Sequence, residues 1–196
     1  MGEDMTNKQT VRLDLLDQGT LDKIERDKRS SEPPGAVLPN PMPRTEWTDY
    51  FLAIAKVVAT RSTCRRIPAG VGAVLVKDRQ ILSTGYAGSI RSLAHCTDDG
   101  VGCLIDEKTG GCVRTVHAEI NAILQAAQHG VSIQGATIYT TLSPCWDCFK
   151  AIVNGGITKI LYSVEYRTVD RQKKFAVDLG LPFLHVGDEK YVPAAK

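Results

Sequence analysis

Apolar residues recur at helical and strand spacings from about residue 45 onward. A helix is expected over 45–61. Its apolar face is formed by Phe51, Ile54, Val57 and Val58. Two β-rich runs, 71–77 and 80–86, flank Asp78-Arg79, and this arrangement predicts a hairpin. Residues 88–114 are rich in Gly, Asp and Cys, and we expect them to form an irregular insert.

The alternation of apolar patterns continues beyond the insert. His117–His129 is expected to be a helix that ends at Gly130. Its core-facing residues are Ile120, Ile123 and Leu124. Strands are then expected over 136–142, 157–164 and 182–186, and helices over 145–154 and 170–179. A hairpin followed by alternating helices and strands indicates an α/β fold around one mixed sheet of about five strands.

The first 46 residues differ from the rest of the chain in their composition and in the regularity of their apolar pattern. Val11–Arg29 shows one or two weak amphipathic helical turns interrupted by Gly19. A proline-rich connector over 31–43 follows, which cannot form a regular helix or a central strand. We therefore interpret 1–46 as an N-terminal extension and 47–196 as the functional domain. The extension is either partly disordered or packed on a neighbouring subunit, and a tail without function is an equal alternative.

Composition and charge narrow the classes of function. Of the 196 residues, 43% are apolar and 23% charged, the balance of a soluble globular protein. The longest apolar runs are far shorter than the ~20 residues that span a bilayer, so no membrane contact is expected. The polar start Met1–Met5 does not resemble a secretory signal, which predicts a cytoplasmic protein. A net charge of +2, from 24 basic and 22 acidic residues, favours a small anionic substrate over nucleic acid.

Two short segments carry the candidate chemistry: His117-Ala118-Glu119 and Pro144-Cys145-Trp146-Asp147-Cys148. Each begins an expected helix. Cys145 and Cys148 are three positions apart, so their sulfurs point to one side and can share a metal ion. The helix N-terminus favours their thiolate forms. Together with His117 they form a set that leaves zinc an open fourth position, as in catalytic sites.

Glu119 lies two residues after His117, beside the ligand set. A carboxylate there can take a proton from water whose pKa zinc lowers toward ~7, deliver it to a ring nitrogen and later protonate departing ammonia. A lone C-x-x-C would also fit a redox pair or half of a structural zinc site, and a lone His a core or surface residue. The combination of H-x-E with P-C-x-x-C ~25 residues later is the signature of nucleobase deaminases.

Longer runs extend this match. The segments 113–124 (VRTVHAEINAIL), 135–139 (GATIY) and 143–148 (SPCWDC) resemble the deoxycytidylate (dCMP) deaminase family, including its bacterial competence-operon branch and its phage members. The resemblance covers about residues 46–186. It implies the three-layer α/β/α sandwich of cytidine deaminases and conversion of dCMP to dUMP for thymidylate synthesis. It also implies a homo-oligomer, often a hexamer, and in many members activation by dCTP and inhibition by dTTP.

The resemblance also implies roles for single residues. His117, Cys145 and Cys148 match the ligands of the catalytic zinc, and Glu119 matches the proton carrier. Tyr166 matches a tyrosine that contacts the substrate in phage members. Its neighbour Arg167 follows the carboxyl end of an expected strand, where ligands bind in α/β proteins. A solvent-exposed charge is the equal alternative for Arg167.

Four further cysteines raise the question of a second metal: Cys64, Cys96, Cys103 and Cys112. Three of them lie in the irregular insert, and four thiolates would make a closed site of the structural kind. Some members of the resembled family carry a second, structural zinc at positions that match these four. His95 beside Cys96 is a competing ligand, and free buried thiols are the alternative.

One loop departs from the family pattern. Residues 85–88 read Gly-Tyr-Ala-Gly where the family usually has Gly-Tyr-Asn-Gly, in a loop that takes part in substrate and effector binding. Ala87 lacks the amide hydrogen bonds of Asn. The departure weakens the expectation of control by dCTP and dTTP, and Ser89 and Arg91 are the candidates to compensate.

The leading hypothesis is a zinc-dependent hydrolase that deaminates dCMP. A second hypothesis keeps the chemistry and changes the substrate to dCTP, a modified cytidine nucleotide or a base in RNA, although the near-neutral charge disfavours RNA. A third is a zinc-stabilised nucleotide-binding module without catalysis, against which the intact Glu119 speaks.

Overall fold

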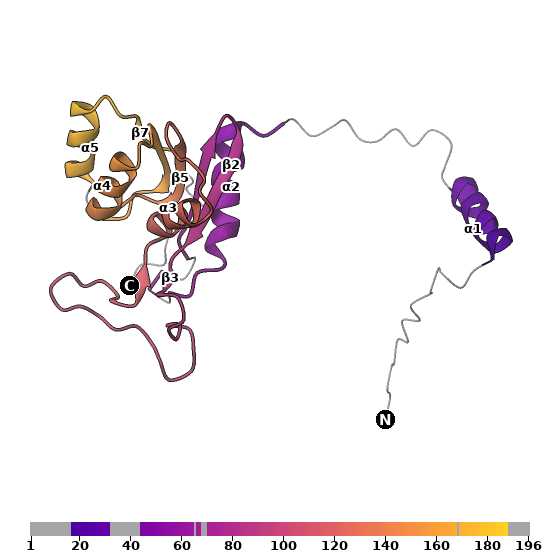
Figure 1. Cartoon of the computed structure of the whole chain (residues 1–196), viewed down its shortest axis with the longest axis horizontal. Coiled ribbons are helices and arrows are strands. Elements are labelled where there is room, and N and C mark those ends of the chain that lie inside the picture. The colour runs from indigo at the N-terminus through magenta and orange to yellow at the C-terminus, as the bar shows by residue number, and fades with distance from the viewer. Residues whose placement is uncertain (1–16, 32–43, 65, 68–69, 168, 188–196) are drawn as a thin grey trace. The chain divides into compact units, whose positions relative to one another are not determined.

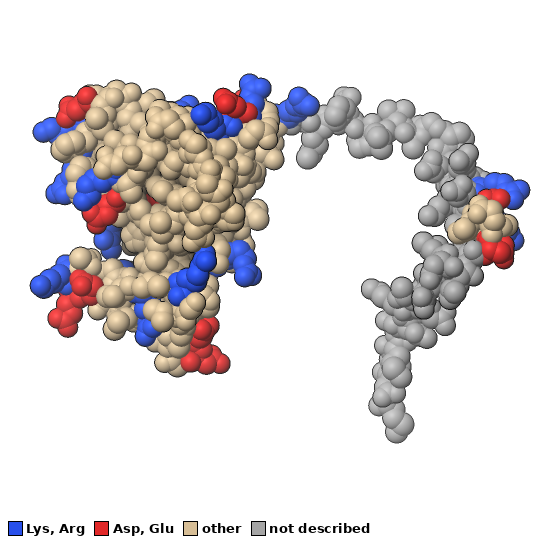
Figure 2. Space-filling model, in the orientation of Figure 1, with Lys and Arg blue, Asp and Glu red and all other residues tan. Residues whose placement is uncertain are grey.

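The computed structural model describes residues 17–31, 44–64, 66–67, 70–167 and 169–187 (Figure 1). The chain divides into two units, Met1–Arg44 and Thr45–Lys196, and each is described by itself. None of the helices in these described ranges is long and apolar enough to cross a membrane. In the space-filling view, acidic and basic side chains are interspersed on the visible face of the second unit (Figure 2).

The first unit contains one described helix, α1 (Gln18–Ser31). Asp17 precedes the helix and caps it, because its carboxylate accepts the main-chain N–H of Thr20 at 2.8 Å. Gly19 lies in the first turn and does not interrupt the helix, so the predicted interruption is wrong. The cap at Asp17 offsets the cost of a glycine at this position. The helical turns expected before Asp17 and the proline-rich connector lie outside the described residues.

A mixed five-stranded sheet forms the centre of the second unit (Figure 1). Its strands are β1 (Gly72–Lys77), β2 (Gln80–Tyr86), β5 (Thr137–Leu142), β6 (Lys159–Val164) and β7 (Phe183–His185). Their order is β2-β1-β5-β6-β7. β1 runs antiparallel to both β2 and β5, whereas β5, β6 and β7 are parallel. The predicted mixed sheet is confirmed. Parallel β5 and β6 end at the same edge of the sheet, and this edge positions the site described below.

Helices cover both faces of the sheet and complete a three-layer sandwich. On one face, α2 (Trp47–Ala59) packs on β1 and β5 through Phe51, Leu52 and Ala55. The other face carries α3 (Ala118–Gln128), α4 (Trp146–Asn154) and α5 (Asp170–Asp178). The core on this face consists mainly of small and branched side chains: Ala73, Leu75, Ala118, Ala122, Ile138, Ile152 and Ile160.

Two residues predicted to face the core are exposed instead. Val57 of α2 is 68% exposed and Leu124 of α3 is 49% exposed. The buried stripe of α3 is formed by alanines, together with Glu119. Gly85 of β2 explains why alanines form this stripe. A Cβ at Gly85 would overlap the Ala118 carbonyl and the Ala122 amide of α3, so the helix lies very close to the strand. The residues of α3 that face this glycine, Ala118 and Ala122, are accordingly small.

The hairpin and the insert agree with the predicted pattern. Asp78 and Arg79 both have positive φ, 49° and 64°, as a two-residue turn between β1 and β2 requires. The insert begins and ends at a two-stranded sheet of β3 (Gly88–Ser89) and β4 (Thr115–Val116). Between them the chain is irregular except for one bridge, Ile105 to Cys112. The insert is therefore anchored at its base beside the start of α3.

Candidate functional site

His117, Cys145 and Cys148 meet where α3 and α4 begin. Both helices start one residue later than predicted, so His117 and Cys145 are the N-caps, with extended backbones, and Cys148 lies in the first turn of α4. The Nδ1 atom of His117 lies 3.4 Å from each of the two Sγ atoms. All three ligand atoms are within 4.8 Å of one another.

This donor set fits a zinc ion. Zn–N bonds of about 2.05 Å and Zn–S bonds of about 2.3 Å at a tetrahedral angle separate N from S by about 3.6 Å. The observed separation of 3.4 Å is close to that value. Three protein ligands are also the number found in catalytic zinc sites, where the fourth position is open.

A hydrogen bond between the two cysteines shifts their pKa values in opposite directions. The hydrogen bond from Cys148, together with that from His117, lowers the pKa of Cys145 to about 4. The same hydrogen bond to Cys145, with burial and the nearby Glu119, raises the pKa of the Cys148 thiol. Cys145 is therefore a thiolate at neutral pH, and its hydrogen bonds raise the pKa of His117 in turn. A cation that replaces the proton of Cys148 would be held by two thiolates.

Glu119 is buried in the first turn of α3, and only 4% of it is exposed. Burial raises the pKa of its carboxyl, and the neighbouring His117 opposes that shift. A carboxyl whose pKa is raised holds a proton more firmly, so it can act as an acid as well as a base. Its position beside the Cys148 thiol places it next to the ligand cluster rather than within it.

One cavity of about 750 Å³ connects these groups with the other predicted site residues. Glu119, His117 and Cys145 line it, and so do Tyr166 and Arg167. Tyr166 follows the end of β6 and Cys145 follows the end of β5, so the parallel strands bring the two together. The structure thus brings two of the sequence-predicted ligands, the predicted proton carrier and the two predicted substrate contacts to a single pocket, with Cys148 adjoining His117 behind its wall.

Arg167 has an unusual backbone. Its φ is +63°, in the left-handed region that residues with side chains seldom occupy. Its guanidinium carbon lies 5.3 Å from the centre of the Tyr166 ring. No carboxylate of the described residues forms an ion pair with it. Strained residues of this kind cluster at functional sites, and here an unpaired cation is held at the pocket wall.

Ala87 also lines the cavity, and its loop is fastened by main-chain bonds. Its N–H donates to the Val71 carbonyl at 2.9 Å, and its carbonyl accepts from the Thr63 amide at 3.0 Å. Arg91 donates to Gln128 instead of reaching toward Ala87. The Ser89 hydroxyl is buried with no partner among the described residues. The side-chain amide of Asn121 in α3 donates to the carbonyl of the preceding residue, Tyr86, at 2.7 Å.

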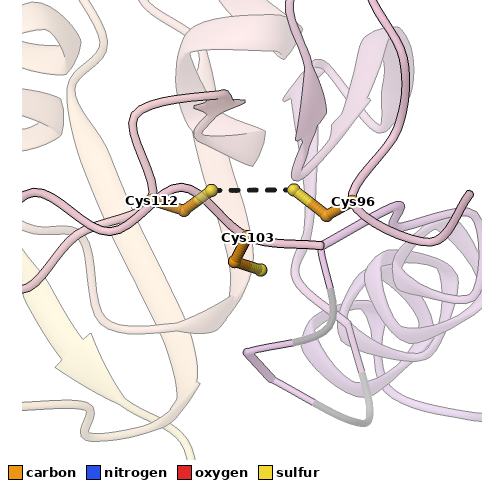
Figure 3. Close-up of side chains that lie close together, drawn as sticks. All are labelled: Cys96, Cys103 and Cys112. Atoms are coloured by element: carbon orange, nitrogen blue, oxygen red, sulfur yellow. Dashed lines mark hydrogen bonds between the residues drawn. The ribbon is translucent and has the colours of Figure 1, made fainter. Parts of the chain in front are cut away.

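A second cluster brings together three of the four remaining cysteines. The sulfurs of Cys96 and Cys112 face each other at 3.6 Å, with Cys103 beside them (Figure 3). The three lie within 4.8 Å of one another. Cys64 is not in this group, and neither is His95. Burial and the adjacent sulfurs, including that of Cys64, raise the pKa of Cys103 to about 12.

Sequence reasoning missed several residues of the pocket. Ser143 and Gln172 are buried at its wall, and Trp146 and Arg171 line it. Ser143 had a visible signal, because it directly precedes Pro144 at the end of a predicted strand. Gln172 had none, since its hydrogen bond to the Pro144 carbonyl joins residues 28 positions apart and depends on where α5 lies.

Comparisons with known proteins agree with this geometry. Residues 45–164 match the profile of the family described as "Cytidine and deoxycytidylate deaminase zinc-binding region". ComE operon protein 2 of Bacillus subtilis is 45% identical over 128 residues, which cover 65% of this chain and 64% of that protein. The deoxycytidylate deaminase of Mycobacterium phage D29 is 38% identical over 131 residues, which cover 63% of this chain and 99% of the phage protein.

A solved structure supports the same relation. The dCMP deaminase of cyanophage S-TIM5, crystallised with dCMP and dUMP, superposes with a TM-score of 0.61 at 29% identity. The match covers 74% of this chain and 99% of the phage chain. The three-layer sandwich described above is therefore the fold of a known dCMP deaminase.

Proposed function

Because the chain belongs to the cytidine and deoxycytidylate deaminase family, we propose that it is a zinc-dependent hydrolase that converts dCMP and water to dUMP and ammonia. The observation that carries this proposal is the pocket in which a His-Cys-Cys cluster lies beside a buried carboxyl. Relatives named deoxycytidylate deaminase support dCMP as the substrate.

In this proposal, His117, Cys145 and Cys148 hold the catalytic zinc. When bound, the zinc lowers the pKa of water at its fourth position to about 7, so that hydroxide is available at neutral pH. The hydrogen bonds that make Cys145 a thiolate already prepare one ligand. The Nδ1 atom of His117 faces the two sulfurs, so the ion would be held by this nitrogen and by the sulfurs of Cys145 and Cys148.

Glu119 carries the protons. Its carboxylate accepts a proton from the attacking water while the water oxygen bonds to C4 of the cytosine ring, and it passes this proton to ring N3. It then transfers the second proton of the water to the 4-amino group. The C4–N bond breaks and ammonia leaves with its electron pair. The raised pKa of Glu119 suits both directions of transfer.

Tyr166 and Arg167 contact the substrate in this proposal. Arg167 has no described acidic partner and lines the same cavity as Glu119. A guanidinium is suited to bind phosphate oxygens in pairs. Stacking on Tyr166 limits the motion of the guanidinium before the substrate arrives.

We also propose that the second cysteine cluster binds a structural zinc. Two sulfurs around a tetrahedral zinc lie about 3.8 Å apart, and those of Cys96 and Cys112 are 3.6 Å apart. Cys103 is the third ligand, and Cys64 is the predicted fourth. Elemental analysis of the purified protein should find about two zinc ions per chain, and Cys103→Ser should lower this to about one. One zinc in the unaltered protein would refute the second site, and an unchanged count in Cys64→Ser would exclude Cys64 as a ligand.

The domain bounds, cellular location, oligomeric state and partners are proposed together. We propose that residues 47–196 form the catalytic domain, that the protein acts in the cytoplasm as a homo-oligomer such as a hexamer, and that it binds neither membrane nor nucleic acid. We also propose regulation by dCTP and dTTP, although Ala87 lacks the amide hydrogen bonds that the family's usual Asn offers at this position. Adding each nucleotide to a dCMP assay tests it: activation by dCTP and inhibition by dTTP support regulation, and an unchanged rate refutes it.

A substrate panel tests the proposed reaction. Purified protein is incubated separately with dCMP, dCTP, cytidine and a tRNA, and released ammonia is measured. We expect the highest kcat/KM with dCMP. Faster turnover of another substrate would refute the assignment of dCMP but keep the deaminase chemistry. No turnover of any of the four, in protein that retains zinc, would favour a non-catalytic module.

A further inference from the structure

Two buried polar side chains outside the predicted machinery join the metal-binding turn to the substrate-binding turn. We infer that Ser143 and Gln172 are positioning residues, which hold the Pro144-Cys145 segment and the Tyr166-Arg167 turn in one fixed relation. Ser143 is 4% exposed and Gln172 is 5% exposed. The inference rests on the proposed function, because it names what aligns the substrate with the metal.

Ser143 extends the pairing of β5 with β6 by one residue beyond the end of β5. Its amide donates to the Val164 carbonyl at 2.9 Å, as in a parallel ladder. Past this point the side chain of Ser143, rather than its backbone, bonds to the neighbouring segment. The hydroxyl oxygen accepts the N–H of Tyr166 at 2.8 Å. The same hydroxyl donates to the Tyr166 carbonyl at 3.1 Å. One side chain therefore satisfies both main-chain groups of the residue that precedes Arg167.

Gln172 fastens the other side of the metal-binding turn. It projects from the first turn of α5, and its amide donates to the Pro144 carbonyl at 3.0 Å. That carbonyl belongs to the peptide that leads into Cys145. Pro144 itself is fully buried. The peptide before the zinc ligand is thus fixed from two directions, by the strand through Ser143 and by the helix through Gln172.

The conformation of Arg167 explains why such anchoring is needed. A left-handed φ at a residue with a side chain costs free energy and persists only where the surroundings enforce it. The paired hydrogen bonds at Tyr166 supply that enforcement one residue earlier. If they are lost, the turn can relax and carry Arg167 out of its position at the pocket wall. A displacement of about 1 Å can lower a rate on the order of a hundredfold.

The test compares Ser143→Ala, Gln172→Met and Ser83→Ala with the unaltered protein. Ser83 is the matched control, since its buried hydroxyl also donates to a main-chain carbonyl, that of Ala122 at 2.8 Å, outside the cavity. Kinetic constants for dCMP, melting temperature and the rate of zinc loss to a chelator are measured for each. Ser143→Thr, which keeps the hydroxyl, is the rescue variant.

We expect Ser143→Ala to raise KM on the order of tenfold with a smaller change in kcat, because the substrate-binding turn moves. Gln172→Met should lose zinc about tenfold faster, because the peptide before Cys145 is released. Ser143→Thr should restore KM. Ser83→Ala should also lower the melting temperature, because it too loses a buried hydrogen bond, yet leave KM and zinc loss unchanged.

Unchanged KM in Ser143→Ala, or a KM change equal to that of Ser83→Ala, would overturn the inference. If Ser143→Ala does not fold, Gln172→Met decides: parental rates of zinc loss and parental kcat would overturn it. If the unaltered protein does not deaminate dCMP, the proposed function fails. The zinc-loss comparison then still tests the anchoring, because it does not depend on the substrate.

Discussion

Replacing Glu119 by Gln keeps the shape of the side chain and removes its ability to carry protons. The carboxyl is 4% exposed, and burial raises its pKa from the usual value near 4.5. General acid–base catalysis contributes about 10² to 10⁴ per proton transfer. Since one residue serves two transfers, we expect kcat to fall by at least about 10⁴, or about 5 kcal/mol in the activation free energy.

Although Glu119→Gln should lower kcat, it should not lower the stability of the protein stripped of metal. In the unfolded chain Glu119 ionises near its usual pKa, whereas in the folded protein burial favours the protonated form. Folded stability is therefore greatest below the unfolded pKa and declines as pH rises through the raised folded pKa. The neutral amide of Glu119→Gln removes this decline, so the variant should melt at the same or a higher temperature at neutral pH.

Zinc analysis, thermal melting and steady-state kinetics with dCMP test both expectations. The zinc content should stay at the parental level, because Glu119 is not among the three ligands. Residual activity above about 1% of the parental value would refute the role of Glu119 as the carrier of both protons. Loss of zinc together with activity would instead show that the carboxyl supports the metal.

Three further predictions follow from the same structure. Gly85→Ala places a Cβ against the Ala118 carbonyl and the Ala122 amide, so urea unfolding should show a loss of about 3 kcal/mol; parental stability would mean that α3 can move away. Arg167→Gly removes the strain of a positive φ, about 1 kcal/mol. The melting temperature should therefore not fall while KM for dCMP rises, and an unchanged KM would refute the substrate contact. Zinc affinity should fall about tenfold per pH unit on acidification for each proton displaced, because the raised pKa of Cys148 keeps that thiol protonated until zinc binds; a Kd independent of pH would contradict the displacement of that proton.

Local chemistry in the sequence predicted the elements and ligands that depend on near neighbours. The turn at Asp78-Arg79 and the end of a helix at Gly130, where φ is 66°, depend on backbone conformations that are determined over a few residues. The pairing of Cys145 with Cys148 follows from helical spacing. The meeting of these cysteines with His117 was predicted from the combined motif, and the structure places all three within 4.8 Å.

Features that depend on how elements pack were not predicted. Val57 and Leu124 fit the helical period but lie outside the core, because hydrophobic spacing alone does not show how closely a helix approaches a sheet. Gly85 determines that approach for α3. Which of the four cysteines come together depends on the paths of two irregular segments, the one that carries Cys64 and the insert that carries the other three, and the sequence offers no periodicity for either.

The most direct test of the account is metal-dependent formation of dUMP. Purified protein is stripped of metal with a chelator, and conversion of dCMP to dUMP is followed before and after zinc is returned. The account predicts that the stripped protein is inactive and that zinc restores stoichiometric release of dUMP and ammonia. Full activity without zinc, or no dUMP after reloading of a folded protein, would contradict it.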